Sequence, residues 1–285
     1  MNSSVRILMA AFAGSAALPL AALSADYEPP IVIDQPVEEV PVEVGSGWYL
    51  RGDIGYNFEV DADDDFNYRT FDPLSGAYGD NVFATGALNE QVTWSAGVGY
   101  NFTDMLRADV TVEGFRMNFD GQTASAAACV DPAVFPAFAG TSCRSEDSST
   151  AAAIGVMANG YVDLGTYVGL TPYVGAGLGY TYVDWGSLGD TVLCVGATCP
   201  VALVSATEHE GDQSWRFTYA LMAGLAYDVS QNLKLDLGYR YRHIDGGPMF
   251  SFDPATIAAG ATGTQGEDPG FTSHEVRIGL RYALW

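Results

Sequence analysis

The stretch H-E-V-R-I-G-L-R-Y-A-L-W (residues 274–285) stands at the end of the sequence and decides how the rest is interpreted. Its apolar residues Val276, Ile278, Leu280, Tyr282 and Leu284 alternate with Glu275, Arg277, Gly279 and Arg281. A strict period of two indicates a β-strand with one apolar and one charged face. A soluble sheet would bury the apolar face, whereas a membrane barrel turns it toward lipid and encloses the charges.

The same alternation recurs along the chain. We predict strands at residues 48–58, 91–102, 106–119, 151–164, 171–183, 215–229, 233–243 and 274–285. Short connections (103–105, 165–170 and 230–232) alternate with long ones (59–90, 120–150, 184–214 and 245–272). Strands of about 11 residues suit a tilted membrane crossing. The sequence therefore predicts an all-β fold, an eight-stranded antiparallel up-and-down transmembrane β-barrel with four long extracellular loops and three short periplasmic turns.

Charged residues fall on the strand face opposite to the apolar one. We predict a lumen ion-pair network of Arg51, Asp53, Arg107, Asp109, Glu113, Arg216, Lys234, Asp236, Arg240, Arg242, Glu275, Arg277 and Arg281. Nearly all its bases are arginine, which pairs with carboxylates through two donors at once. The long connections are instead strongly acidic, with Arg69 and Arg144 as their bases. The formal net charge of −23 argues against a nucleic-acid partner, which would require many Lys and Arg residues.

Aromatic residues gather toward both ends of the predicted strands. At the short-turn end these are Trp48, Tyr100, Phe102, Tyr227, Tyr282 and Trp285. Toward the long connections they are Tyr56, Phe58, Tyr180, Tyr182, Trp215, Phe217 and Tyr241. Two such groups are typical of the two interfaces of a membrane, where an aromatic ring has one apolar and one hydrated edge.

The residues before the barrel form two further segments. Residues 1–25 combine Arg6 with an apolar, alanine-rich run and small residues near Ser24, which predicts a cleaved signal peptide. Residues 26–47 are rich in proline and acids and predict an extended periplasmic leader, so residues 48–285 form the barrel. In an exported chain the four cysteines suggest disulfides, and we expect the local pairs Cys129–Cys143 and Cys194–Cys199.

The segment G-W-Y-L-R-G-D-I-G-Y (residues 47–56) and the closing strand resemble the small outer-membrane β-barrel proteins of alphaproteobacteria, relatives of the OmpA transmembrane barrel and of opacity-type surface antigens. The resemblance covers about residues 47–285. It implies export to the cell outer membrane and contact with outer-membrane lipid and lipopolysaccharide. It also implies insertion by the barrel-assembly machinery, with Tyr282 and Trp285 as the C-terminal insertion signal.

Three functions are weighed on these residues. The first is a non-enzymatic barrel with a structural or surface-interaction role, because eight strands leave an interior just wide enough for side chains to fill. The alternative is a porin-like narrow channel for small solutes or ions, with water beside Gly175, Gly177, Gly179 and Gly224. A less favoured possibility is an enzyme that modifies lipid A, using His243, His274, Ser273, Glu275 and Asp245. The strand phase puts both histidines toward lipid but Ser273 and Glu275 toward the lumen, which disfavours it.

We expect no cofactor and no metal. The acidic run at residues 61–65 lacks the glycine and distal glutamate of a calcium-binding EF-hand loop. No histidine lies near Cys129 or Cys143 in the sequence, which disfavours a zinc site. An extracellular ligand of the loops is not identified by these patterns.

Overall fold

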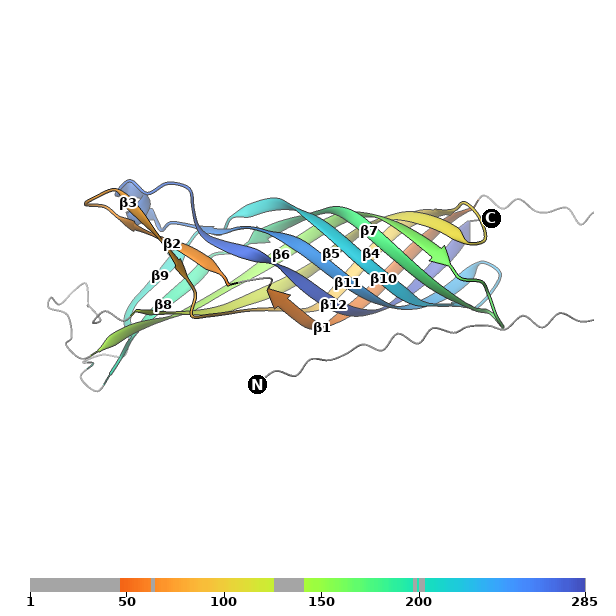
Figure 1. Cartoon of the computed structure of the whole chain (residues 1–285), viewed down its shortest axis with the longest axis horizontal. Helices are drawn as coiled ribbons and strands as arrows, with labels where there is room; N and C mark the ends of the chain where they lie inside the picture. Colours follow the sequence, from red (N-terminus) through yellow and green to blue (C-terminus); the bar gives the residue numbers. More distant parts are fainter. Residues whose placement is uncertain (1–46, 63–64, 126–140, 197–198, 200–202, 285) are drawn as a thin grey trace, which may run out of the picture. The chain divides into compact units, whose positions relative to one another are not determined.

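The structure is a computed structural model, and it describes residues 47–62, 65–125, 141–196, 199 and 203–284. The predicted signal peptide and all of the leader except Gly47 lie outside these residues. Eight of the described strands close into a ring (Figure 1). They are β1 (Trp48–Ala62), β4 (Thr85–Asn101), β5 (Leu106–Ser125), β6 (Ser142–Asp163), β7 (Leu170–Trp185), β10 (Gln213–Asp228), β11 (Leu233–Ser251) and β12 (Thr264–Leu284).

The ring is an antiparallel, up-and-down barrel. Each strand pairs with its neighbours in chain order, and β1 closes the ring by pairing with both β4 and β12. At the closure, Trp48 lies between Tyr100 of β4 and Leu284 of β12. A closed ring satisfies the hydrogen bonds of both edges, which lipid cannot do. The predicted fold class is therefore confirmed.

The alternation of exposed and buried residues assigns the two faces of the ring. Leu280, Leu237 and Val98 point outward and are 52%, 54% and 42% exposed, whereas Arg277 points inward and is 8% exposed. A soluble sandwich would show the reverse. Exposed apolar side chains surround the ring from the short turns up to about the level of Phe58. We call this part of the ring the membrane belt.

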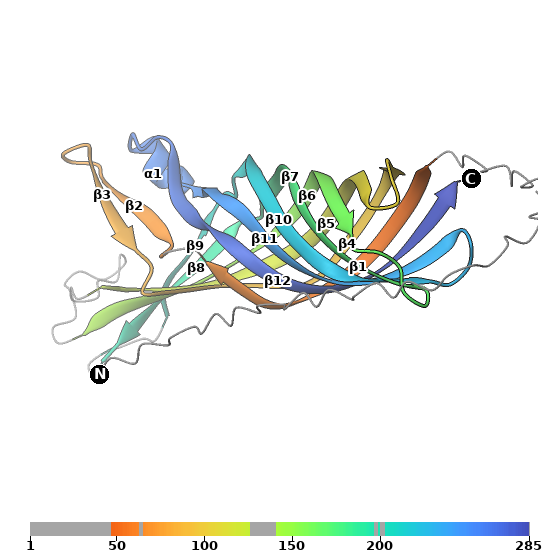
Figure 2. The same cartoon turned by 45° about the vertical axis from the view of Figure 1, so that its right-hand side comes forward.

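Beyond the membrane belt the same strands continue into an outer extension. It comprises residues 59–62 of β1, 85–91 of β4, 115–125 of β5, 142–153 of β6, 183–185 of β7, 213–214 of β10, 244–251 of β11 and 264–273 of β12. Four shorter strands and one helix join it (Figure 2): β2 (Asn67–Asp72), β3 (Ala77–Val82), β8 (Leu188–Val195), β9 (Leu203–His209) and α1 (Pro254–Ala258). The hairpin β2–β3 pairs with β12, and β8 pairs with β6.

Several predicted strands were too short at the end that forms the outer extension. β6 begins at Ser142 rather than near residue 151, and β11 continues to Ser251 rather than ending near residue 243. Much of what was expected to be loop is therefore strand. The prediction followed outward apolar residues, and these end where the membrane belt ends although the hydrogen-bonded ladder continues. No helix among the described residues has the length and hydropathy needed to span a membrane.

Candidate functional site: the barrel interior

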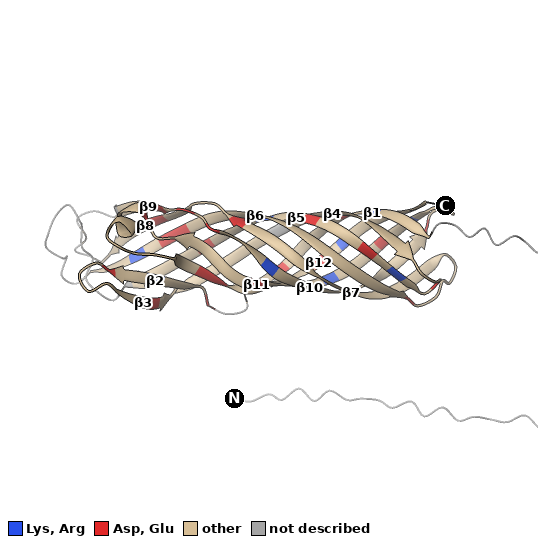
Figure 3. Cartoon of the chain, turned by 90° about the horizontal axis from the view of Figure 1, so that it is seen from above, with Lys and Arg blue, Asp and Glu red and all other residues tan. Residues whose placement is uncertain are grey.

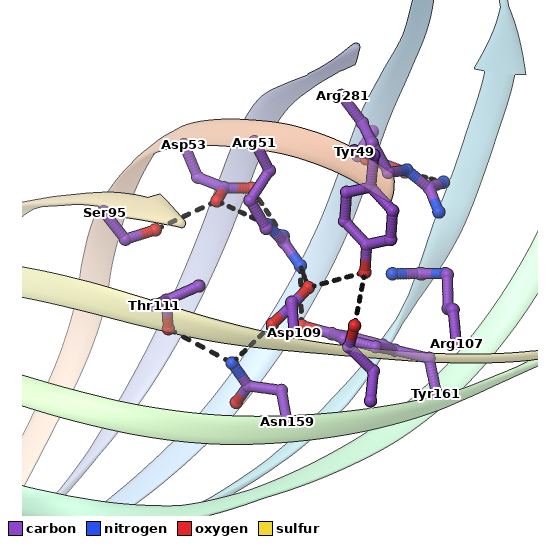
Figure 4. A network of polar contacts seen from close by, with 12 residues as sticks. Tyr49, Arg51, Asp53, Ser95, Arg107, Asp109, Thr111, Asn159, Tyr161 and Arg281 are labelled. Carbon is purple, nitrogen blue, oxygen red and sulfur yellow. Dashed lines mark hydrogen bonds and ion pairs between the residues drawn. The ribbon is translucent and has the colours of Figure 1, made fainter. Parts of the chain in front are cut away.

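Arg51 is the centre of a polar cluster in the membrane belt (Figure 4). Its guanidinium donates to both carboxylate oxygens of Asp53, at 2.7 Å and 3.0 Å. Its Nη1 also donates to Asp109 Oδ2 at 2.8 Å and to the Tyr161 hydroxyl at 2.7 Å. Asp109 in turn accepts from the Asn159 amide at 2.8 Å. Because β1, β5 and β6 all contribute, this cluster ties several sides of the ring together.

A second cluster lies one layer further from the turns. Arg240 Nη1 contacts Glu113 Oε2 at 2.5 Å, and Arg242 lies 3.8 Å from the other carboxylate oxygen of Glu113. Arg277 lies 3.2 Å from Glu275. Its Nη2 also donates to Ser95 at 2.9 Å. Each of these charged groups is at least nine-tenths buried, so the charges neutralise one another away from solvent.

Arginines near the short turns pack on aromatic rings as well as on acids. Arg107 lies 3.1 Å from Asp163, and its guanidinium carbon lies 3.8 Å from the centre of the Tyr161 ring. Arg281 pairs with Asp236 at 3.0 Å. Cation–π contacts of this kind stabilise a guanidinium that has lost its hydration.

Lys234 is the exception within the predicted network. Its ammonium lies 2.6 Å from Asp228, and both side chains are about one-third exposed at the turn end of the ring. Here a vestibule of about 340 Å³ opens, with Asp163, Lys234 and Arg281 in its lining. Tyr49, which is fully buried, also lines it.

The structure therefore brings together twelve of the thirteen predicted lumen residues as buried groups, with Lys234 at the rim. The sequence interpretation missed several partners, namely Tyr49, Ser95, Asn159, Tyr161 and Asp268. Asp268 pairs with Arg216 at 2.6 Å from a segment that was expected to be loop. Tyr49 and Tyr161 share the strand phase of the predicted arginines, and that periodicity could have identified them.

The channel hypothesis supposed water beside the glycines of β7, but side chains lie against these glycines instead. A side-chain carbon at Gly175 would lie 2.5 Å from the Tyr161 ring, and one at Gly177 would lie 2.2 Å from the amide oxygen of Asn159. The glycines thus make room for polar side chains of the neighbouring strand β6.

Above the charged clusters the interior changes character. An apolar cluster fills the outer extension, formed by Phe66, Phe83, Leu88, Phe115, Met117, Phe119, Ala151, Ala153, Val183, Trp185, Leu188, Ile244, Met249, Phe250 and Phe271. Phe66 and Phe83 flank the β2–β3 hairpin, so the hairpin region contributes to this core. Arg242 joins the two regions, with its guanidinium 4.1 Å from the Phe115 ring. This cluster was not predicted from the sequence, although Phe115, Met117 and Phe119 continue the inward phase of Glu113 along β5.

The histidines offered for catalysis do not assemble with Ser273 and Glu275. His274 Nδ1 lies 2.6 Å from the Tyr239 hydroxyl on the outer face, while Ser273 and Glu275 are each 1% exposed inside the ring. His243 Nε2 lies 3.1 Å from Asp245. The strand phase inferred from the sequence is correct here. It places the hypothetical nucleophile, Ser273, and the hypothetical base, His274, on opposite faces of the sheet.

The remaining predicted features divide by location. Cys194 and Cys199 form a disulfide. Cys129, the expected partner of Cys143, lies outside the described residues, as does Trp285 of the expected insertion signal. Tyr282 is 40% exposed on the outer face. Asp63 and Asp64 of the acidic run also lie outside the described residues.

These observations define the class of protein: a transmembrane β-barrel with a charged interior and an apolar outer surface. The chain belongs to the outer membrane protein beta-barrel domain family, whose model matches residues 10–283. Membership in this family supports a location in the outer membrane.

Two curated relatives and one solved structure are similar to this chain. An uncharacterized protein of Brucella suis biovar 1 is 37% identical over 92% of this chain and 94% of its own length. An uncharacterized protein of Brucella melitensis biotype 1 is 38% identical with the same coverage. The crystal structure of Neisserial surface protein A covers 85% of this chain and 99% of its own, at 16% identity and a TM-score of 0.41.

Proposed function

We propose that this protein is a closed outer-membrane barrel that serves a structural or surface-interaction role and does not conduct solutes. The observation that carries the proposal is the two-layer filling of the interior. Buried arginine–carboxylate pairs occupy the membrane belt, and an apolar core occupies the outer extension. An ion would have to displace both layers, and the apolar layer offers it no polar ligands.

The outer end supports a role in surface interaction. Exposed acids such as Asp80, Asp120, Glu146 and Glu208 cover strands that project beyond the belt, and Figure 3 shows red acidic segments around β3, β8 and β9. A surface with this excess of one sign attracts cationic partners and repels anionic ones. We further propose contact with lipid and lipopolysaccharide around the belt, export through residues 1–25, and insertion by the barrel-assembly machinery.

A narrow channel is the second candidate, and the vestibule at the turn end favours it. Conductance of the refolded protein in a planar bilayer separates the two. We expect no steady unitary current, because Tyr49 lines the vestibule and donates to Asp109, which also binds the buried Arg51. Steady unitary currents that vanish on Arg240→Ala or Arg277→Ala would contradict closure. Lys234→Ala is the matched control, because Lys234 lies at the rim and does not cross the lumen.

A lipid-modifying activity has less support, because Ser273 and Glu275 lie inside the ring while His274 lies outside it. We therefore propose that the protein is not an enzyme. Analysis of lipid A from cells that express the protein tests this directly. Unchanged lipid A is expected, and a new acylation or deacylation product that disappears on His274→Ala would contradict the proposal.

A further inference from the structure

A small pocket lies in the outer extension, away from the charged clusters of the belt. It has a volume of about 120 Å³ and is bordered by β2 and Phe83 just after β3, by β5, β6, β8 and β9, and by β11 and β12. A single water needs only about 10–15 Å³ measured in this way. The pocket therefore has room for a ligand of several non-hydrogen atoms.

Two carboxylates face each other in the pocket wall. Asp147 of β6 is directly opposite Asp190 of β8 in the strand register, and both side chains line the cavity. Ser145 donates to Asp147 Oδ2 at 2.6 Å, and Thr207 donates to Asp190 Oδ2 at 3.3 Å. Like charges placed directly opposite on one sheet face destabilise the strand pair. The pair therefore needs a compensating positive charge or a shared proton.

Three buried polar side-chain atoms around the pocket have no hydrogen-bond partner among the described residues. They are Asp190 Oδ1, His209 Nδ1 and Gln265 Oε1. His209 is only 7% exposed, so bulk water does not readily form a hydrogen bond with its Nδ1 atom. Buried polar atoms are almost always hydrogen-bonded, and orphaned ones call for an explanation. A bound donor would provide one.

The chemistry of the lining selects the donor. None of the described residues that line the pocket is Lys or Arg, so no permanently charged base neutralises its carboxylates there. Aromatic rings of Tyr68, Phe83 and Phe250 form another part of the wall. Among the described residues, no three His, Cys, Asp or Glu side chains are placed to hold a metal ion. Carboxylates beside aromatic rings instead suit an organic ammonium group.

We propose that this pocket binds a small protonated amine. The ammonium group donates to Asp147 and Asp190, and its alkyl chain packs on the aromatic wall. This proposal gives the surface-interaction role a ligand class. It rests on the proposed function, which places the outer extension, and with it the pocket, outside the cell. Amine binding and bilayer conductance are separate measurements on the refolded protein. Failure to bind the amine would therefore not change the outcome of the conductance test.

Acidity supplies a further means of testing the site. Burial, together with the neighbouring Asp190 carboxylate, raises the pKa of Asp147 to about 7. The other titratable groups that face it are Tyr68 from β2 and His209 from β9. Because Asp147 must be ionised to hold the ammonium group at full strength, affinity for the amine rises between pH 6 and pH 8.

The experiment is calorimetric titration of the refolded protein in detergent with 1,4-diaminobutane at pH 8, with 1,4-butanediol as the uncharged analogue. We expect saturable binding of the diamine alone. Asp190→Asn removes one charge with little change in shape and lowers affinity at least tenfold. Glu208→Gln removes the same charge from an exposed neighbour of His209 and leaves affinity unchanged.

Several outcomes would overturn the proposal. These are no saturable binding, equal binding of the diol, or equal losses in the two variants, which would indicate a diffuse attraction to the acidic surface. Binding of Mg²⁺ in place of the diamine would make the pocket a metal site instead. Heat-modifiable migration checks that each variant is folded, and Asp147→Asn provides a second variant if Asp190→Asn does not fold.

Discussion

The membrane belt and the outer extension are built from the same strands, but their polar and apolar faces are exchanged. The belt is apolar outside and charged inside, whereas the outer extension is polar outside and apolar inside. In the belt, β5 points Arg107, Asp109 and Glu113 inward and exposes Val110 to the outside. A few residues later the same strand buries Phe119 and exposes polar residues. The strand phase does not change at this point; the chemistry of the two faces does.

The inversion follows from the medium around each region. Lipid surrounds the belt, so apolar side chains face outward and the charges must find partners inside. Water surrounds the outer extension, so an ordinary apolar core becomes favourable there. The comparison shows that one closed sheet can pass from a membrane barrel to a soluble-type barrel without a break in its hydrogen-bonded ladder.

The largest effect should come from leaving buried charge in the belt without a partner. Glu113→Leu leaves Arg240 and Arg242 facing an apolar side chain, and we expect a loss of about 3–5 kcal/mol in the free energy of unfolding. Denaturant unfolding of the refolded barrel measures it. The matched control is Glu146→Gln, which breaks an ion pair of 2.8 Å between half-exposed side chains and should cost less than about 1 kcal/mol. Similar small losses for both would mean that water reaches the lumen arginines.

The apolar core of the outer extension should be nearly as sensitive to a different change. Phe119→Ala removes a fully buried ring and is expected to cost about 3 kcal/mol. The charged clusters of the belt are not touched, so heat-modifiable migration should persist. Leu74→Ala removes a side chain that is 97% exposed and should change stability by no more than about 0.5 kcal/mol. If Phe119→Ala were equally harmless, the outer extension would not contain a packed core.

A third prediction compares the outward faces of the two regions along one strand. Val110→Arg places a charge in the belt and should destabilise the barrel by about 2–4 kcal/mol. Asn118→Arg places the same charge on the exposed face of the outer extension, where about 0.5 kcal/mol or less is expected. Unfolding of the two variants in lipid vesicles gives the difference. Equal values would show that the belt does not end between these positions.

The last prediction concerns a pH dependence that arises in the outer extension. The folded-state pKa of Asp147, raised by burial and by Asp190 from 3.8 to about 7, lies above its unfolded value. The folded state therefore holds a proton that the unfolded state releases, and this stabilisation is full below about pH 4 and is lost as pH rises through 7. Stability measured without amines should fall less across this interval in Asp147→Asn than in the unchanged protein. An identical slope in both would exclude Asp147 as the titrating group.

Sequence periodicity located the belt because lipid imposes a simple rule on each strand. Every second residue from Trp48 to Phe58 had to be tolerable to hydrocarbon, and the residues between them, such as Arg51 and Asp53, could then face only the lumen. The same rule put His274 outside and Ser273 inside. Local alternation was therefore enough to fix the fold class, the orientation of each face and the composition of the charged interior.

Only the tertiary structure decided which residues pair across the ring and how the outer end is filled. Glu113 of β5 and Arg240 of β11 stand on opposite strands of the ring and lie 127 residues apart in the sequence, so no local pattern encodes their contact. The apolar core beyond Phe115 escaped notice because its inward phase matches that of a soluble strand and its outward residues are polar. Whether a side chain points inward or outward depends on the period of its strand, which can be read from the sequence. Which residue it pairs with depends on barrel closure and strand register, which arise only when distant strands meet.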